Sequence, residues 1–146
     1  MDLDTFRQLA GFDADSYIKK IKDELGIKRV RVLFDNPNSQ AMSRHAGPEE
    51  ILEIHLPALD TILAQKSELS TNEAVAKLKS AIAEELCHSQ FRETDHNHSV
   101  VGCTISEMQK HLTSEELAYP YIKEKIFHLE QAAEVFKGTP IKKKQD

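Results

Sequence analysis

Apolar and polar positions repeat with two different periods along this chain, and the two periods predict both helices and strands. From Asp13 to Gly26 the apolar residues recur every three or four positions, which is typical of an amphipathic helix. Residues 28–35 and 51–56 instead alternate with a period of two and are rich in branched side chains, which predicts two short strands. The predicted fold is therefore α+β: a small sheet, with room for one more strand, packed by helices.

The longest helical segment, residues 71–92, is the one around which we expect the fold to be organised. Ser70 and Glu73 form an S-x-x-E capping box, which marks the start of a helix. Four apolar residues then fall on one side at about 100° per residue, and they predict the buried stripe: Val75, Leu78, Ile82 and Leu86.

Local signals predict further helices toward both ends of the chain. A short helix fits residues 3–10, and residues 58–66 fit a short helix or an ordered loop. Thr104 begins a second S/T-x-x-E pattern that predicts a helix over 105–112, and Pro120 suits the first turn of a last helix, 120–136. Residues 41–50 are expected to be irregular, and Pro57 to end the second strand or confine it to a sheet edge.

Composition narrows the class of protein. The chain has 146 residues, 40% of them hydrophobic, which predicts one globular domain over residues 1–138 and a disordered basic tail over 139–146. The net charge of −5 and the absence of an apolar run near 18 residues give no reason to expect nucleic-acid binding or a membrane. Two cysteines are too few for a disulfide framework, so a reducing, cytoplasmic location is expected.

Side chains that bind metals gather at the end of the long predicted helix. Three of the seven histidines fall between His88 and His98. Glu84 and His88 are four residues apart, so their side chains leave the same face of the helix and can reach one ion. Glu85 lies on the same turn, where a carboxylate can act on water polarised by a metal.

The segment Glu84 to His88 reads EELCH, and it resembles the HExxH active-site helix of zincin metallopeptidases with Glu84 in place of the first histidine. The order of one helix, two strands and then this helix, over roughly residues 15–100, is similar to the zincin order. The resemblance implies a bound zinc ion held by Glu84, His88 and a downstream ligand. It also implies Glu85 as general base for peptide or amide hydrolysis.

The downstream ligand has several candidates. His96 is preferred, and Asp95 and His98 are the alternates beside it. Glu107 or His111, on the following predicted helix, could also supply the ligand, as in zincins whose last ligand lies on a later helix. The remaining histidines, His45, His55 and His128, are interpreted as structural or surface groups.

Two other functions compete with the enzyme. His88, His96, His98 and Cys103 would make a closed, structural zinc site with four protein ligands. Alternatively the chain is a non-catalytic interaction or regulatory module with a degenerate zincin-like fold, in which Glu84 and Glu85 face solvent or pair with Lys or Arg. For the enzyme, the expected partner is a peptide or protein added along an edge strand, 51–56 being the candidate.

Overall fold

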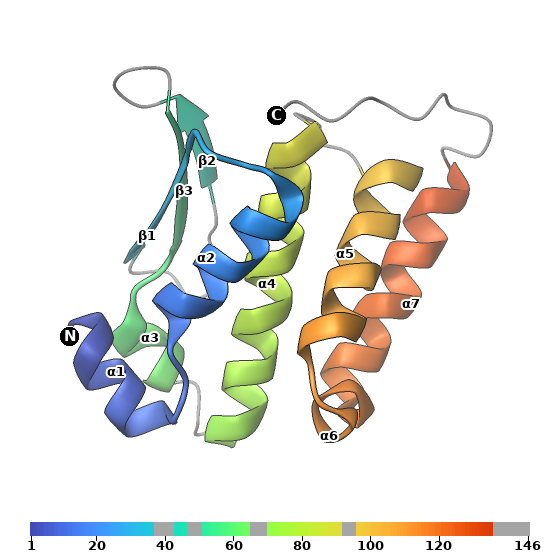
Figure 1. Cartoon of the computed structure of the whole chain (residues 1–146). Coiled ribbons are helices and arrows are strands. Elements are labelled where there is room, and N and C mark those ends of the chain that lie inside the picture. Colours follow the sequence, from blue (N-terminus) through green and yellow to red (C-terminus); the bar gives the residue numbers. More distant parts are fainter. Residues whose placement is uncertain (37–42, 47–50, 65–69, 92–95, 136–146) are drawn as a thin grey trace. The chain divides into compact units, whose positions relative to one another are not determined.

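The computed structural model describes residues 1–36, 43–46, 51–64, 70–91 and 96–135 (Figure 1). The predicted tail, 139–146, lies outside the described residues. Seven helices and three strands are assigned in the described part of the chain. They are α1 (Leu3–Ala10), α2 (Ala14–Leu25), β1 (Val30–Asn36), β2 (Ser43–Ala46), β3 (Leu52–Pro57), α3 (Leu59–Ala64), α4 (Thr71–Phe91), α5 (His98–His111), α6 (Ser114–Ala118) and α7 (Pro120–Val135). The predicted α+β class, with a small sheet and a long helix, is confirmed.

The contacts of the chain group into two compact units, Met1–Val75 and Ala76–Asp146. The boundary falls inside α4, whose first turn belongs to the first unit and whose remainder belongs to the second. The organisation as one domain over residues 1–138 stays a prediction.

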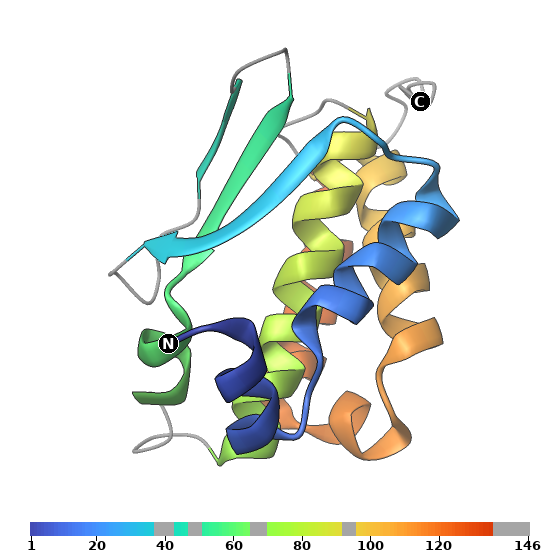
Figure 2. The ribbon, with the colours of Figure 1, turned by 60° about the vertical axis from the view of Figure 1, so that its left-hand side comes forward.

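The first unit holds the sheet, whose strands can be followed in Figure 2. The strand order is β1-β3-β2, with β1 parallel and β2 antiparallel to β3. The predicted alternation is confirmed on β3, where Ile54 and Leu56 are fully buried while Glu53 and His55 share the other face. One expectation was wrong, because residues 43–46, expected to be irregular, form β2.

The position of β3 corrects a second expectation. We expected residues 51–56 to form an edge strand that could receive a peptide. In the structure β3 is the central strand, paired with β1 along one edge and with β2 along the other. Its backbone N–H and C=O groups therefore serve these two ladders, and β3 offers no open edge for strand addition.

The polar face of this sheet is organised around His55. Its Nδ1 lies 2.8 Å from both carboxylate oxygens of Asp35, and its Nε2 lies 3.5 Å from Glu53. The hydrogen bond to Asp35, opposed in part by burial, raises the pKa of His55 above its usual value. His55 is thus a structural group, as expected, but it is part of an ionic cluster rather than isolated.

Helix ends in the first unit follow the local signals of the sequence. Asp2 and Asp13 cap α1 and α2 by accepting hydrogen bonds from backbone N–H groups. Gly11 and Gly26 end the same two helices in the left-handed conformation, at φ of 68° and 70°. The short helix expected over 58–66 is present as α3.

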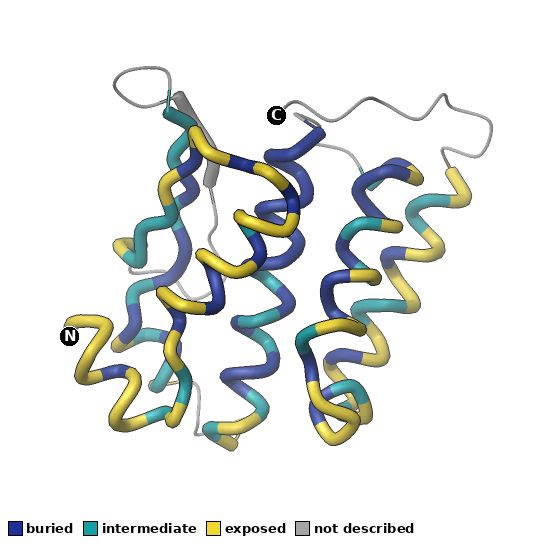
Figure 3. The backbone as a smooth tube through the Cα atoms, viewed as in Figure 1, coloured by how far each residue is buried: buried dark blue, intermediate teal, exposed yellow. Residues whose placement is uncertain are grey.

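In the second unit α4 is the buried helix. The predicted stripe is buried: Leu78, Ile82 and Leu86 lie in this unit, and Val75 is the last residue of the first unit. Every residue from Ile82 to Phe91 is buried as well (Figure 3). Burial on all sides is typical of a core helix rather than a surface helix. Polar side chains on the last turns of α4 must therefore find partners inside the protein.

The start of α5 differs from the prediction. The S/T-x-x-E pattern at Thr104 does not begin a helix, because Thr104 lies inside α5 and its hydroxyl donates to the carbonyl of Val100. Asn97 is the cap, and its Oδ1 accepts from the N–H of Val100. A capping box does begin the next helix, α6, where Thr113 and Glu116 cap each other's backbone N–H groups.

Among the described helices, none is both long enough and apolar enough to cross a lipid bilayer.

Candidate metal centre

Two of the candidate ligands come from consecutive turns of α4. Glu84 is 9% exposed and His88 is 3% exposed, so both polar groups are inside the protein. Their i, i+4 spacing directs them to the same side, and His88 Nε2 lies 3.7 Å from Glu84 Oε2. The predicted pairing of Glu84 and His88 is thus present in the structure.

His96 is brought to this pair by the start of α5. It is two residues before the first residue of α5, next to the cap residue Asn97, which is 4% exposed. Its Nε2 lies 2.6 Å from Glu84 Oε2. A carboxylate can only accept hydrogen bonds, so the Nε2 of His96 is the donor in this contact.

The ligand-type atoms of Glu84, His88 and His96 all lie within 4.8 Å of one another. The two imidazole rings are tilted, with centroids 5.0 Å apart. The Nε2 atoms of both rings approach the same oxygen, Glu84 Oε2. One carboxylate and two imidazoles within this distance form a group that could hold a metal ion, with zinc among the metals that accept these ligands.

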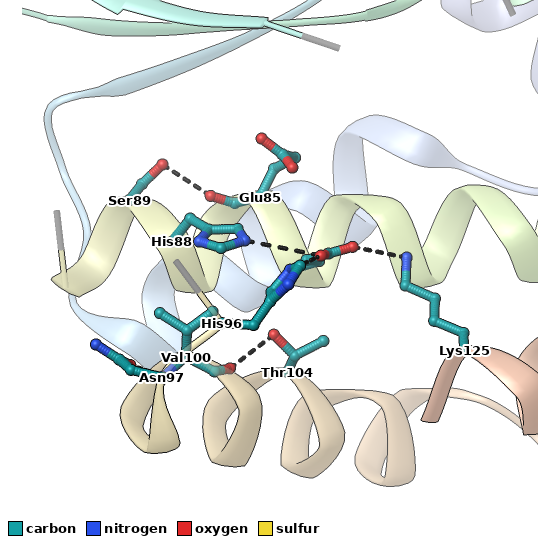
Figure 4. Close-up of polar contacts among 9 residues, drawn as sticks. Glu85, His88, Ser89, His96, Asn97, Val100, Thr104 and Lys125 are labelled. Atoms are coloured by element: carbon teal, nitrogen blue, oxygen red, sulfur yellow. Dashed lines mark hydrogen bonds and ion pairs between the residues drawn. The ribbon is translucent and has the colours of Figure 1, made fainter. Parts of the chain in front are cut away.

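Lys125 of α7 completes the surroundings of Glu84, and sequence reasoning missed it. Its Nζ lies 2.8 Å from Glu84 Oε1, the carboxylate oxygen that does not contact His96 (Figure 4). Both side chains are mostly buried, at 13% and 12% exposure. The sequence held a signal, because Lys125 falls three residues after Ile122 and four before Leu129, both buried. A lysine on an apolar stripe indicates a buried acidic partner.

The charge state of Glu84 follows from these contacts. Burial alone would raise the pKa of its carboxyl, but His88, His96 and the ammonium of Lys125 together hold that pKa far below the ordinary value of 4.5. Glu84 is therefore ionised at neutral pH, as a metal ligand must be.

Glu85, the predicted general base, is also buried, at 8% exposure. Its backbone carbonyl accepts a hydrogen bond from Ser89. In Figure 4 its carboxylate points to the side of α4 away from α5, whereas His96 lies on the α5 side. The group formed by Glu84, His88 and His96, whose ligand atoms lie within 4.8 Å of one another, does not include Glu85.

The structure contradicts one alternative set of metal ligands. Cys103 forms a disulfide with Cys87, with Cα atoms 5.8 Å apart, so neither sulfur is a thiolate ligand in this state. Cys103 is therefore not available to the closed four-ligand site in this structure, which contradicts that alternative. His98 is exposed at the first position of α5.

Three further candidate ligands were predicted: Asp95, Glu107 and His111. Asp95 is outside the described residues. Glu107 and His111 pair with each other on α5 at 3.2 Å, and neither belongs to the group of Glu84, His88 and His96.

Comparison of the chain with protein-family models, curated proteins and solved structures finds no match. The zincin resemblance therefore rests on the sequence alone, through the EELCH segment and the order of the elements before it.

Replacing Lys125 by Met should destabilise the protein, because it leaves the buried carboxylate of Glu84 without its cationic partner. We expect the free energy of unfolding, measured by urea denaturation, to fall by about 3 kcal/mol. Lys123→Met is the matched control, since Lys123 is exposed on the same helix. Its expected change is within about 0.5 kcal/mol. Equal effects of the two substitutions would show that Glu84 does not depend on Lys125.

The depressed pKa of Glu84 also predicts a pH dependence. Because the folded pKa lies below the unfolded value of 4.5, the stabilisation is fully present above that pH and is lost as the pH falls further. The stability difference between the wild type and Glu84→Gln should therefore shrink between about pH 5 and pH 3. Urea denaturation at each pH measures it. Glu115→Gln, at an exposed site on α6, provides the control. A constant difference across this range would contradict the assignment.

Proposed function

We propose that this protein binds one zinc ion through Glu84, His88 and His96, and that it uses the ion to hydrolyse a peptide or amide. The observation that carries the proposal is the meeting of three ligand-type side chains, from α4 and the start of α5, within 4.8 Å in a buried setting. Buried carboxylates and imidazoles are uncommon unless they are paired or bind a metal.

The two oxygens of the Glu84 carboxylate contact different partners, and this arrangement suits a metal ligand. Oε2 faces the Nε2 atoms of His88 and His96, and Oε1 faces Lys125. An ion bound between Oε2 and the two nitrogens would leave the Lys125 contact in place. Lys125 would then orient the ligand from outside the coordination shell, as partners of metal ligands commonly do.

Three protein ligands are the number found in catalytic zinc sites, which keep one position for water or substrate. A zinc ion bound there would act as a Lewis acid and make a water molecule more acidic. A carboxylate in place of one histidine adds negative charge and weakens this effect. The positive charge of Lys125 beside the same carboxylate offsets part of that added charge.

Glu85 is the residue of this chain that would take the proton from water. It lies on the same turn of α4 as the ligands, about 60° around the helix from His88. Its carboxylate is buried and points to the side of α4 away from α5 (Figure 4), so general-base catalysis requires the side chain to turn toward the ion. The substrate class, a peptide or amide, comes from the zincin resemblance, and the proposal includes no nucleic acid or membrane partner.

A second function is favoured by one specific observation. The ion pair of Glu84 with Lys125 is the pairing expected of a non-catalytic module, and together with His96 it satisfies the carboxylate without a metal. In that case the three side chains and Lys125 join α4, α5 and α7 as a polar core. The protein would then act through its surface.

Metal binding is tested with tag-free protein stripped by a chelator and titrated with zinc. We expect about one zinc per chain, and His88→Ala or His96→Ala should weaken binding by at least about tenfold, because each removes a direct ligand. His98→Ala is the matched control for His96→Ala, since His98 is exposed two residues away. Binding that is insensitive to His88 and His96 would rule out this site.

The catalytic step is tested with Glu85→Gln. If Glu85 is the general base, hydrolysis of a peptide library by the zinc-loaded protein should fall by about a hundredfold or more. Zinc affinity should stay unchanged, because Glu85 is not a ligand. Glu115→Gln controls for loss of a carboxylate at a remote site. A zinc-bound wild type that hydrolyses nothing would favour the non-catalytic function.

A further inference from the structure

The disulfide lies directly beside the proposed metal ligands. Cys87 immediately precedes His88 in α4, and Cys103 lies in α5, the helix that begins just after His96. The bond therefore links the turn that carries Glu84 and His88 to the helix that positions His96. The sequence alone gave no reason to pair these two cysteines.

The position of His96 depends on where α5 begins. Asn97, the next residue, is fixed to α5 by two hydrogen bonds: its side chain accepts from the N–H of Val100 and its carbonyl from the N–H of Val101. If α5 moves relative to α4, Asn97 and His96 move with it. The distance from His96 to Glu84 is therefore set by the contact between these two helices, and the disulfide is a covalent part of that contact.

We propose that the Cys87–Cys103 disulfide is a redox control on metal binding by Glu84, His88 and His96. This inference rests on the proposed zinc site. The oxidised form holds the three ligands together, and reduction lets the start of α5 move away from α4. Zinc affinity then falls, because the ligands must be brought together when the metal binds.

The reaction requires a dithiol reductant, either a small molecule or a protein. The dithiol gives up two electrons and two protons and becomes a disulfide. The S–S bond between Cys87 and Cys103 breaks, and each sulfur becomes a thiol. Cys87 is fully buried but Cys103 is only half-buried, so a reductant can approach the Cys103 sulfur first.

A reducing, cytoplasmic location is expected for this chain, and a disulfide that responds to reductants would be useful as a control there. Disulfides in cytosolic proteins are uncommon and usually transient or redox-sensing. The bond joins cysteines 16 positions apart, and a disulfide that closes such a loop restricts the chain substantially. Its removal is therefore expected to affect His88 and His96, which both lie inside the loop.

The test is a zinc titration of the tag-free protein before and after treatment with a water-soluble phosphine. The phosphine takes oxygen from water to become a phosphine oxide and leaves two thiols, and it adds no thiol ligand of its own. Reduction should weaken zinc binding by about tenfold or more. The double variant Cys87→Ala with Cys103→Ala should match the reduced protein and should not respond to the phosphine.

A general loss of stability must be separated from this effect. Leu112→Ala truncates a buried side chain at the end of α5 and leaves the disulfide and the ligands intact. It should lower stability without the tenfold loss of zinc affinity. An equal loss in Leu112→Ala, a reduced protein that unfolds by circular dichroism, or zinc binding that is unchanged or tighter after reduction would each overturn the redox control.

A metal-free measurement separates failure of this inference from failure of the zinc site. The rings of His88 and His96, with centroids 5.0 Å apart, should give a nuclear Overhauser effect in the oxidised protein without metal. Reduction should weaken it. If the oxidised protein binds no zinc, the proposed function fails, and this signal still reports whether the disulfide positions His96. A signal unaffected by reduction contradicts that positioning.

Discussion

A buried carboxylate is the constraint on which the second half of this protein depends. Glu84 is ionised inside the structure, where an uncompensated charge would cost several kcal/mol. Its compensation comes from three separate segments: His88 on α4, His96 before α5 and Lys125 on α7. The charge can be satisfied only when these helices are in place. A single side chain thereby couples the packing of three helices to the geometry of the candidate site.

Most of the secondary structure could be predicted because its signals are local. Periodicity and caps located α2, α4 and α7 to within a residue or two, and glycines marked two helix ends. The start of α5 was misplaced for an equally local reason. The S/T-x-x-E pattern also occurs inside helices. There the hydroxyl of Thr104 donates a hydrogen bond to the carbonyl of Val100, one turn earlier. Asn97 is the cap instead. The position of β3 between β1 and β2 could not be predicted, because strand order is set by long-range pairing.

In the candidate site, too, local contacts could be predicted from the sequence and long-range contacts could not. Glu84 and His88 are related by helix geometry alone, so the sequence predicts their contact. His96 follows closely enough to be a reasonable choice. Lys125 and the partnership of Cys87 with Cys103 depend on how α5 and α7 pack, and no short pattern encodes that. A lysine within the apolar stripe of α7 indicates that some buried acid exists. It does not indicate which one.

The metal-free arrangement also explains how one set of side chains can be stable both with and without an ion. The proton on His96 Nε2 and the ammonium of Lys125 occupy different oxygens of Glu84. A metal ion at Oε2 would take the place of the His96 N–H, whose proton would move to Nδ1 of the same ring, and it would keep the ammonium contact. In the folded structure without metal the three ligand groups already lie within 4.8 Å of one another, with Glu84 held by Lys125 and His96 by the start of α5. Such preorganisation lowers the cost of bringing the ligands together when the ion binds.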